Sequence, residues 1–451
     1  MADRHAVVWA RSAAGPVKMG SLVATDRECR FSYSEDFLHR RPAPGLALLA
    51  GPELFGAEPV VYRSSARMPL HPRLMSLIPA DSPGNLQRRI HTELLARRDP
   101  PPAPGFETEW ELLLLTGHGG IGHIDVFRDD LEATEWYANP VHPQTVVGHR
   151  SAVWRFVREE IEQSGHAVPA DTVAGLLGPT PSVGGMIPKL LVSIVDAPHW
   201  DGRFAPPGTP AIDGRPAVDV ILKIEPAAYA GLAELEALCL ALHRELGFEV
   251  PRYWRADVDG MPLLAVERFD RAPDGMPLPM ETFLSVMASG SRAVRGSVDG
   301  EWESVGRMLE RLGRVASLNV RRAQREVYRR FVLAFLTGNG DLHLENLAFL
   351  GGADAVRVAP VYDPSPMRAW PRHDLRSALP LDLDPALGVA ENLYALGAAF
   401  GLKRDEAADI WSDLRRRSAD YPERILALQA VPEARRRALA ELVRRERGLF
   451  G

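Results

Sequence analysis

Short apolar runs of the kind that form strands open the chain. HAVVWA at 5–10 and MGSLVAT at 19–25 are brief and aliphatic, which is typical of β-strands. Proline-rich stretches interrupt the pattern at 41–45 and at 98–105, and such stretches mark turns and loops. After the second interruption, ETEWELLLL at 107–115 has helical periodicity. These patterns predict a small mixed domain.

The middle of the chain predicts a small lobe of strands with one helix. LLVSI at 190–194, AVDVILKI at 217–224 and PLLAVERF at 262–269 are rich in β-branched or aliphatic residues, as strands are. Between the last two, LAELEALCLALHRELG at 232–247 is strongly amphipathic. Gly247 is suited to end this helix, because glycine readily adopts the left-handed backbone found just after a helix.

Helical spacing dominates from residue 276 onward. Apolar residues recur at helical intervals in five segments: 302–318, 322–337, 389–400, 404–417 and 431–446. The polar stretch 128–145 is expected to be a surface connection, and a helix is expected at 149–165. The sequence thus predicts an α+β protein in which a β-rich part is followed by a helical part.

The composition is that of a soluble globular protein. The 451 residues carry a formal net charge of -6 and 46% are hydrophobic, which is enough for two or three domains with proper cores. The negative balance argues against a general nucleic-acid coat. No apolar run approaches the roughly 20 residues of a membrane span, the first residues lack the apolar core of a secretory signal, and Cys29 and Cys239 have no metal-ligand spacing. We therefore expect a cytoplasmic protein with no membrane contact and no disulfide framework.

A loop near residue 340 holds three polar side chains between apolar segments. GNGDLHLENLAFL at 338–350 follows FVLAFL at 331–336 and contains Asp341, His343 and Asn346. Loops pinned in this way often carry function. Asp341 and Asn346 have the Asp-x-x-x-x-Asn spacing of protein kinases, in which the Asp orients the attacking hydroxyl and the Asn holds a metal. For His343, an orienting or phosphate-contacting role is favoured over metal ligation, because no second histidine lies at ligand spacing.

A second acid follows in VAPVYDPSP at 358–366. An apolar strand is expected to end at Asp363, because Pro364 follows it. Oxygen ligands of this kind suit Mg²⁺ bound to phosphates. Taken singly, an aspartate in a turn is more often a local cap than a catalyst. The order of Asp341, Asn346 and Asp363 favours a site for a magnesium-bound triphosphate.

Lys223 lies in the otherwise apolar strand AVDVILKIEP at 217–226. One interpretation is a strand-end lysine whose amine reaches water, which is the usual case. The other is a lysine that contacts nucleotide phosphates, since a buried lysine is costly unless it is paired or binds an anion. The following helix carries Glu234 and Glu236, and of these Glu236 is preferred as the ion-pair partner of Lys223.

A loop suited to covering phosphates precedes this strand. PTPSVGGMIPKLLVSI at 179–194 contains Ser182, Gly184, Gly185 and Lys189 near a tight turn. Glycines let backbone N–H groups approach phosphate closely. Taken alone, an ordinary Gly-Gly hairpin turn is the favoured interpretation.

Another glycine-rich stretch, GHGGIG at 117–122, has the literal spacing of a dinucleotide-binding motif. That motif needs a preceding strand and a following helix, whereas here a helical pattern comes first. We interpret these glycines as a structural turn.

Six stretches, in order and at matching spacing, resemble the HipA-like serine/threonine kinases of bacterial toxin–antitoxin modules. They are SVGGMIPK (182–189), ILK (221–223), ELGFEVP (245–251), VERFDR (266–271), GNGDLHLEN (338–346) and VYDP (361–364). The resemblance covers most of the chain and is loose before residue 100. It implies a two-lobed, protein-kinase-like α+β fold with an N-terminal accessory domain at 1–128. A β-rich lobe with the phosphate loop and hinge is implied at 129–275, and a helical lobe with the catalytic and metal-binding loops at 276–451.

The resemblance also implies roles for individual residues. Asp341 is the catalytic residue, Asn346 and Asp363 hold Mg²⁺, and Lys223 contacts the phosphates of ATP. Further nucleotide contacts are implied for the phosphate loop, the hinge, a residue beside the ribose and two residues near the nucleotide: Gly184, Gly185, Met186, Ile187, Pro188 and Lys189; Glu267, Arg268 and Phe269; Asp270; His343 and Tyr362. Ser182 matches a serine that some family members autophosphorylate, which would inhibit by adding negative charge beside ATP.

Two residues depart from the family pattern. Pro188 removes one backbone donor from the phosphate loop, so the loop is expected to cradle phosphate differently. Glu345 stands where a lysine is common beside Asn346, and its negative charge near the metal site is expected to shift substrate preference.

The reaction implied is transfer of the γ-phosphoryl group of ATP, with Mg²⁺, to a protein Ser or Thr hydroxyl. By the resemblance, the substrate is an aminoacyl-tRNA synthetase and the consequence is arrest of translation. A small helix-turn-helix antitoxin of the HipB type is the implied partner, through which the protein would reach DNA only indirectly. Two alternatives remain: a small-molecule kinase on the same fold, and a non-catalytic nucleotide-binding regulator that acts through the antitoxin.

Overall fold

The computed structural model describes residues 3–40, 43–81, 85–138, 146–148, 154 and 187–450. The chain divides into two compact units: unit 1 comprises Met1–Ala228 with Arg252–Glu281, and unit 2 comprises Tyr229–Pro251 with Thr282–Gly451. This division differs from the three expected domain ranges, because the segment Tyr229–Pro251 groups with the C-terminal part. In the described parts of the chain, no helix combines the length and the apolar composition that crossing a membrane requires.

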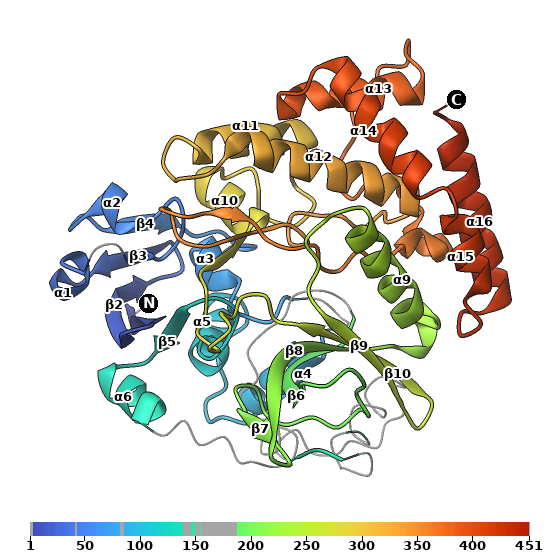
Figure 1. Ribbon diagram of the computed structural model, residues 1–451. Helices are drawn as coiled ribbons and strands as arrows, with labels where there is room; N and C mark the ends of the chain where they lie inside the picture. The colour runs from blue at the N-terminus through green and yellow to red at the C-terminus, as the bar shows by residue number, and fades with distance from the viewer. Residues whose placement is uncertain are drawn as a thin grey trace. The chain divides into compact units, whose positions relative to one another are not determined.

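Unit 1 begins with an antiparallel sheet in the strand order β4-β3-β2-β1-β5 (Figure 1). Its strands are β1 (Arg4–Ser12), β2 (Gly15–Ala24), β3 (Glu28–Tyr33), β4 (Val60–Arg63) and β5 (Ile124–Phe127). Ala6, Val8 and Ala10 alternate along β1 and are all buried, as in a strand with one face on a core. The strands predicted at 5–10 and 19–25 are confirmed, and β5 is a strand that the sequence analysis missed.

The helices of this part of unit 1 are mostly short. They are α1 (Glu35–Leu38), α2 (Pro52–Phe55), α3 (Pro72–Met75), α4 (Leu86–Ala96), α5 (Phe106–Thr116) and α6 (Asp130–Ala138). Helix α5 confirms the prediction at 107–115. Helix α6 lies in the stretch expected to be a polar surface connection. Most of its residues are exposed or half-buried, as expected, but the helix itself was not predicted. The Asp129 carboxylate accepts a hydrogen bond from the Glu132 N–H at 2.9 Å and so supports the helix start. The helix expected at 149–165 falls outside the described residues.

The second sheet of unit 1 has the strand order β6-β8-β10-β9, with β7 paired to β8. Its strands are β6 (Lys189–Val195), β7 (Ala211–Ile212), β8 (Arg215–Ile224), β9 (Tyr253–Val258) and β10 (Met261–Glu267). All three strands predicted for the middle of the chain are confirmed. Leu190, Leu222 and Ala265 belong to one buried cluster on this sheet. Neighbouring strands therefore hold a common core.

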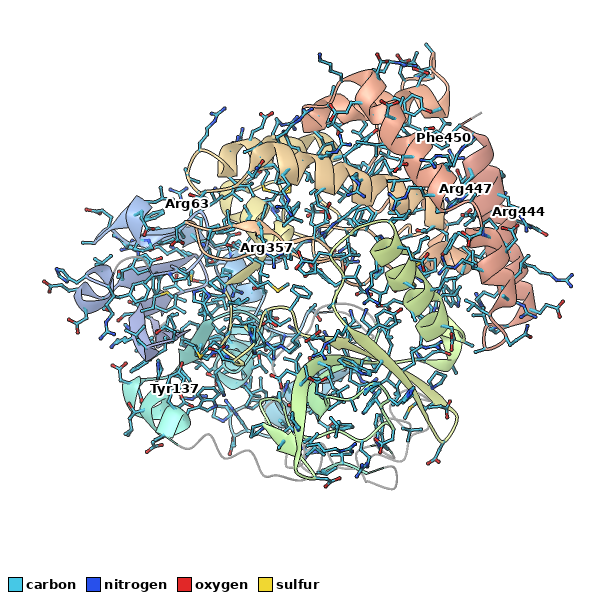
Figure 2. The ribbon with its side chains drawn as sticks, in the orientation of Figure 1. Arg63, Tyr137, Arg357, Arg444, Arg447 and Phe450 are labelled. Carbon is cyan, nitrogen blue, oxygen red and sulfur yellow. The ribbon has the colours of Figure 1, made fainter. Side chains whose placement is uncertain are left out.

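Unit 2 is built mainly from helices (Figure 1). They are α9 (Leu232–Glu245), α10 (Phe283–Gly290), α11 (Trp302–Leu312), α12 (Val320–Thr337), α13 (Val389–Leu396), α14 (Arg404–Arg417), α15 (Tyr421–Ala427) and α16 (Glu433–Gly448). Each helical segment predicted for this part of the chain overlaps one of them. Gly247, with φ of 84°, follows α9 as expected. Near the end of the chain, the ring of Phe450, which is labelled in Figure 2, stacks on Trp411 with centroids 4.2 Å apart.

The prediction of a strand leading to Asp363 is wrong beyond Val358, the first residue of the predicted stretch. Strand β13 covers only Arg357–Val358 and pairs with β12 (Ala348–Leu350). Pro360 and Pro364 have no N–H to donate to a ladder. The N–H of Val361 instead donates to the carbonyl of Glu249 at 2.8 Å. The N–H of Ala359 donates to the carbonyl of Ala348 at 2.8 Å. The backbone before Asp363 is therefore an irregular segment held by isolated hydrogen bonds.

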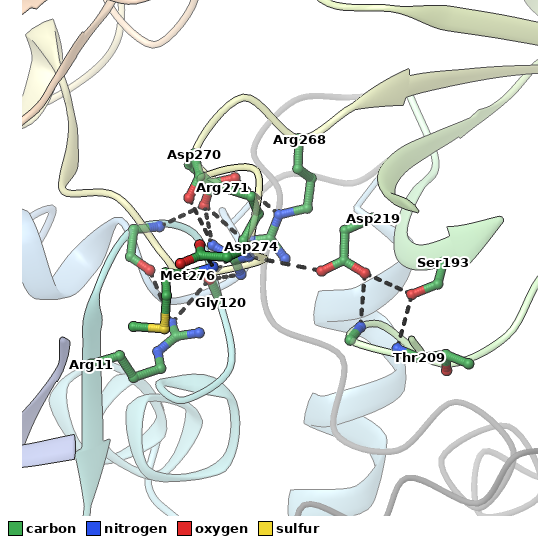
Figure 3. Close-up of polar contacts among 12 residues, drawn as sticks. Arg11, Gly120, Ser193, Thr209, Asp219, Arg268, Asp270, Arg271, Asp274 and Met276 are labelled. Carbon is green, nitrogen blue, oxygen red and sulfur yellow. Dashed lines mark hydrogen bonds and ion pairs between the residues drawn. The ribbon is translucent and has the colours of Figure 1, made fainter. Parts of the chain in front are cut away.

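A buried ionic cluster ties the segment after β10 to the loop before β5 (Figure 3). The Asp270 carboxylate accepts from Arg268 at 2.8 and 3.0 Å, from Arg271 at 2.8 Å and from the N–H of Gly122 at 2.8 Å. The Gly120 carbonyl accepts from Arg268 at 2.8 Å and from Arg271 at 3.2 Å. The stretch GHGGIG is thus a structural turn, in agreement with the interpretation from the sequence.

The charge on Asp270 is maintained by its partners. Burial alone would raise the pKa of this carboxyl, but Arg268 and Arg271 outweigh that effect and hold the pKa well below its ordinary value. Asp270 is therefore ionised at neutral pH, with 3% of its surface exposed.

Asp270→Asn is expected to lower the free energy of unfolding by about 3–5 kcal/mol, because it leaves buried arginines without their carboxylate. Asp213→Asn is the matched control, since Asp213 pairs with Arg203 at 2.8 Å but on the surface, where an ion pair contributes about 0–1 kcal/mol. Urea denaturation of both variants measures the two losses. Equal losses would contradict the structural role of Asp270.

Candidate catalytic and nucleotide-binding site

Helix α12 leads into the candidate catalytic loop. Its second half is buried, including Phe331, Leu333 and Leu336, so the end of the helix is fixed by packing. The helix stops at Gly338, which has φ of 77°. Glycine adopts this left-handed conformation without steric cost. The chain can therefore turn sharply into Asn339 while the helix stays in the core.

The backbone of Asp341 is held from both sides. Its N–H donates to the Asn339 side-chain oxygen at 2.9 Å. Its carbonyl accepts from the N–H of His343 at 2.9 Å and from the Asn346 side-chain nitrogen at 2.8 Å. Asp341 is half-buried and Asn346 is buried. These bonds fix the place from which the Asp341 carboxylate projects, and they bring Asp341 and Asn346 together as predicted.

Gly340 is required by a close approach of two backbone segments. A Cβ atom at this position would lie 2.0 Å from the carbonyl oxygen of Leu375 and 3.0 Å from the Arg368 side chain. In addition, the N–H of Arg368 donates to the Gly338 carbonyl at 3.1 Å. The segment 366–376 therefore packs directly on the catalytic loop.

His343 is oriented by its neighbours in the same loop. Its Nδ1 accepts from the N–H of Glu345 at 3.2 Å, and its carbonyl accepts from the N–H of Asn346 at 3.0 Å. Among the described residues, no group of three or more His, Cys, Asp or Glu side chains could hold a metal. The orienting or nucleotide-contacting role of His343 remains a prediction.

Asp363 is joined to the catalytic loop through its neighbour. The Tyr362 hydroxyl donates to the Glu345 carbonyl at 2.6 Å, so the residues next in sequence, Asp363 and Asn346, lie in connected segments. Asp363 has φ of 53°, a conformation that residues other than glycine rarely adopt. Such strain is characteristic of functional sites.

The Asp363 conformation differs in context from the other positive-φ aspartates of the described chain. Asp213 and Asp259 each precede a glycine, Gly214 and Gly260, in a tight turn between strands, where this backbone is ordinary. Asp363 precedes a proline instead. Its conformation therefore has no hairpin turn to account for it.

Ser365 links the segment of Asp363 to helix α9, and the sequence analysis missed it. Its hydroxyl lies 2.9 Å from the Glu236 carboxylate and 3.4 Å from the Asp363 carboxylate. Ser365 and Glu236 are 5% and 2% exposed. A serine hydroxyl has one proton to donate, so it bonds one carboxylate at a time and bridges the Asp363 segment to Glu236. No local signal points to this residue, because its partner is 129 positions away.

The donor set of this loop fits magnesium. The Asn346 side-chain nitrogen donates to the Asp341 carbonyl, so the amide oxygen points away from that carbonyl. Together with the Asp363 carboxylate it provides hard oxygen donors from two connected segments, which is the kind of ligation that Mg²⁺ accepts while it keeps waters and phosphate oxygens.

Two lysines of unit 1 lie directly opposite each other on paired strands. Lys189 of β6 is the register partner of Lys223 of β8, and directly opposite residues project from the same face of a sheet. They are only 6% and 7% exposed. Both side chains therefore lie on the same face of the sheet, near the end of β8. The phosphate-contacting roles of Lys223 and Lys189 remain predictions.

The remaining predicted residues of unit 1 lie around the end of β10. Glu267 is ion-paired with Arg252 at 2.8 Å, and the N–H of Arg268 donates to the Asp219 carbonyl at 2.9 Å. Arg268 and Asp270 belong to the buried ionic cluster described above, so their side chains have a structural role. The backbone contact of the hinge with adenine and the ribose contact of Asp270 remain predictions.

The structure brings the predicted residues together in two groups. Unit 2 contains one group: Glu236, Asp341, His343, Asn346, Tyr362 and Asp363. Unit 1 contains the other: Ile187, Pro188, Lys189, Lys223, Glu267, Arg268, Phe269 and Asp270. Ser182, Gly184, Gly185 and Met186 fall outside the described residues. The Lys223–Glu236 ion pair remains a prediction.

Comparison with known families and proteins gives three similarities. The profile of a family described as the HipA-like C-terminal domain matches residues 181–421. A protein of Haemophilus influenzae named "Putative kinase" is 29% identical over 188 residues, which are 40% of this chain and 51% of that protein. The protein "Putative kinase Y4dM" of Sinorhizobium fredii is 30% identical over 156 residues, 32% of this chain and 36% of that protein. The chain thus spans about half the length of one relative and about a third of the other.

Among solved structures, the chain resembles HipA in a complex of Shewanella oneidensis HipA, HipB and operator DNA. The TM-score is 0.62 at 17% sequence identity, and the match covers 96% of this chain and 95% of that chain. At this identity the likeness shows the fold alone. It confirms the predicted two-lobed, kinase-like α+β fold.

Gly340→Ala is expected to destabilise the protein by about 1–3 kcal/mol, because the added methyl group collides with backbone rather than with a movable side chain. Thermal unfolding measures the loss, and hydrogen exchange should show faster exchange within 366–376. Gly448→Ala is the control: nothing lies within 4 Å of a Cβ there, and alanine favours helix. A neutral Gly340→Ala would contradict the close packing of segment 366–376 on the loop.

Proposed function

The chain belongs to the HipA-like family, and from that premise we propose that it is an ATP- and magnesium-dependent kinase that phosphorylates a Ser or Thr of a protein. The observation that carries the proposal is the hydrogen-bonded frame of Asp341, Asn346 and the Tyr362–Asp363 segment. It has the parts that phosphoryl transfer requires: a carboxylate for the hydroxyl and oxygen donors for a metal.

In this mechanism Asp341 orients the substrate hydroxyl and accepts its proton as the phosphoryl group transfers. Asn346 and Asp363 would hold a magnesium ion, which would supply positive charge to offset that of the phosphates. Lys223 and Lys189 contact the phosphates from the sheet of unit 1. Most of the catalytic effect then comes from positioning and charge stabilisation, which is why the fixed backbone of Asp341 matters.

The other family roles complete the proposal. Gly184, Gly185, Met186, Ile187 and Pro188 cover the phosphates together with Lys189. Glu267, Arg268 and Phe269 form the hinge, with Asp270, His343 and Tyr362 near the nucleotide, and Ser182 is the candidate for inhibitory autophosphorylation. Glu236 pairs with Lys223. Each of these roles follows from the motif positions in this sequence.

Substrate and partner are proposed from the family. An aminoacyl-tRNA synthetase is the proposed substrate, and a HipB-type helix-turn-helix antitoxin is the proposed partner. The solved complex of the Shewanella protein contains HipB and operator DNA, which supports the choice of partner. In that arrangement the chain would reach DNA through the antitoxin.

Asp341→Asn is expected to lower kcat by about 10²–10⁴, because the amide orients the hydroxyl poorly and cannot take its proton. Transfer of radioactive γ-phosphate to lysate polypeptides, followed by phosphoproteomics, measures it. Asp354→Asn is the matched control on an exposed turn and should match the wild type. Label found only in a small molecule would identify a small-molecule kinase. ATP binding without any transfer would identify a non-catalytic regulator.

Ser365→Ala is expected to raise the Mg²⁺ concentration needed for half-maximal nucleotide binding by about tenfold, because the hydroxyl orients the metal ligand Asp363. Ser365→Thr retains the hydroxyl and should recover most of the affinity. Ser418→Ala is the control, since it removes a buried hydroxyl that accepts from Arg447 at 2.8 Å without touching the site. The rise in unfolding temperature caused by Mg²⁺ and ADP measures the affinity without turnover. Unchanged Mg²⁺ dependence in a folded Ser365→Ala would exclude this role.

A further inference from the structure

Two arginines lie over two aromatic rings in unit 2. The Arg372 guanidinium is 4.4 Å from the centroid of Tyr229, and that of Arg435 is 4.7 Å from the centroid of Trp370. The two rings meet edge to face, 5.4 Å apart. Tyr229, Trp370, Arg372 and Arg435 thus form one cluster, here called the arginine platform.

The charge of the platform is not balanced by an acid. Among the described residues, neither Arg372 nor Arg435 forms an ion pair; Arg435 donates to the Ala369 carbonyl at 3.0 Å. Burial and then the charge of Arg372 lower the pKa of Arg435, so the two cations repel. Trp370 is 3% exposed, and its Nε1 has no hydrogen-bond partner in the described structure.

The helix on which Arg435 sits adds to the imbalance. Arg435 lies in the first turn of α16, where the helix dipole is positive and a cation is disfavoured. The acid of the same turn, Glu433, is paired with Arg437. The platform therefore combines two cations, a positive helix end and a buried N–H donor. An anion bound there would relieve their repulsion.

The platform lies beside the candidate catalytic loop. His373 follows Arg372, and its Nε2 is 2.8 Å from the Tyr229 hydroxyl. Burial and then the charge of Arg372 lower the pKa of His373, and the charge of Asp341 opposes this lowering. The same segment touches Gly340 through the Leu375 carbonyl. A chain whose hydroxyl reaches Asp341 would have its neighbouring residues within reach of Arg372 and Arg435.

We propose that the arginine platform binds acidic side chains close to the phosphorylated Ser or Thr of the protein substrate. The inference rests on the proposed kinase function and adds a substrate class to it. Guanidinium groups stacked on rings keep their N–H edges available, and these edges match carboxylates in charge and geometry.

An acidic peptide segment fits the platform better than nucleic acid does. Recognition of single strands uses open aromatic faces on which bases stack, whereas here both rings carry an arginine. Two guanidinium groups also form a small site, and the chain as a whole has a net charge of -6, which opposes association with a long polyanion.

The experiment compares two serine-centred peptide libraries that differ only in flanking Glu or Gln. The enzymes are the wild type, Arg372→Gln, Arg372→Gln/Arg435→Gln, Arg372→Glu and the control Arg445→Gln, which changes an exposed arginine of the same helix. We expect the wild type to prefer Glu-flanked peptides by about tenfold in kcat/KM, mainly through KM. The double variant should lose the preference, Arg372→Glu should reverse it toward the Gln-flanked peptides, and Arg445→Gln should keep it.

Binding of fluorescent Glu-flanked and Gln-flanked peptides, followed by anisotropy, provides a readout that needs no turnover. Equal binding of both peptides by the wild type, or binding of neither, would overturn the platform even if phosphoryl transfer is intact. Competition by poly(U) that disappears in the double variant would assign the platform to nucleic acid instead. If the arginine substitutions change the KM for ATP by the same factor with both libraries, the arginines only support the fold. Failure of the kinase proposal appears separately, as an Asp341→Asn enzyme indistinguishable from the wild type in lysate labelling.

Discussion

The hydrogen bonds to the backbone of Asp341 are the constraint on which the candidate site depends. A carboxylate that orients a hydroxyl must be held to within a fraction of an ångström, yet this one lies in a loop. The loop is made rigid because its polar groups bond to one another: the Asn339 side chain takes the Asp341 N–H, and the Asn346 side chain reaches the Asp341 carbonyl.

The same constraint accounts for the residues around the loop. Gly338 lets helix α12 end inside the core, and Gly340 lets the segment 366–376 approach within backbone contact. Tyr362 and Ser365 then connect the loop to Asp363 and to Glu236 of helix α9. A change at any of these positions acts on Asp341 or Asp363 through a short chain of bonds. Such chains explain how residues that touch no substrate can still affect catalysis.

Local patterns in the sequence were enough for the regular elements and for the central motif. Helix α9, strands β8 and β10 and the Asp341–Asn346 spacing all depend on residues close together in the chain, so periodicity and spacing were sufficient to find them. The irregular path before Asp363 was misread as a strand because apolar character outweighed the two prolines in the prediction.

Features that depend on distant pairing could not be found in this way. The register that sets Lys189 opposite Lys223 pairs two residues more than thirty positions apart, and the Ser365 bond crosses 129 positions. The structural role of the buried Asp270 carboxylate depends on a hydrogen bond from the N–H of Gly122, which is far away in the sequence. A single sequence contains no local signal for such contacts, because they form only when the chain is folded.

Each compact unit carries its own set of candidate-site charges. Unit 1 carries two buried lysines at opposite register positions, and unit 2 carries Glu236 and Asp363 around one hydroxyl. The fold of each unit places its own set: strand register puts the lysines on one face of a sheet, and the Ser365 hydroxyl joins the segment of Asp363 to helix α9. Phosphoryl transfer uses cationic side chains for phosphates and oxygen donors for a metal, so the charges found in the two units are of the kinds that the proposed kinase function requires.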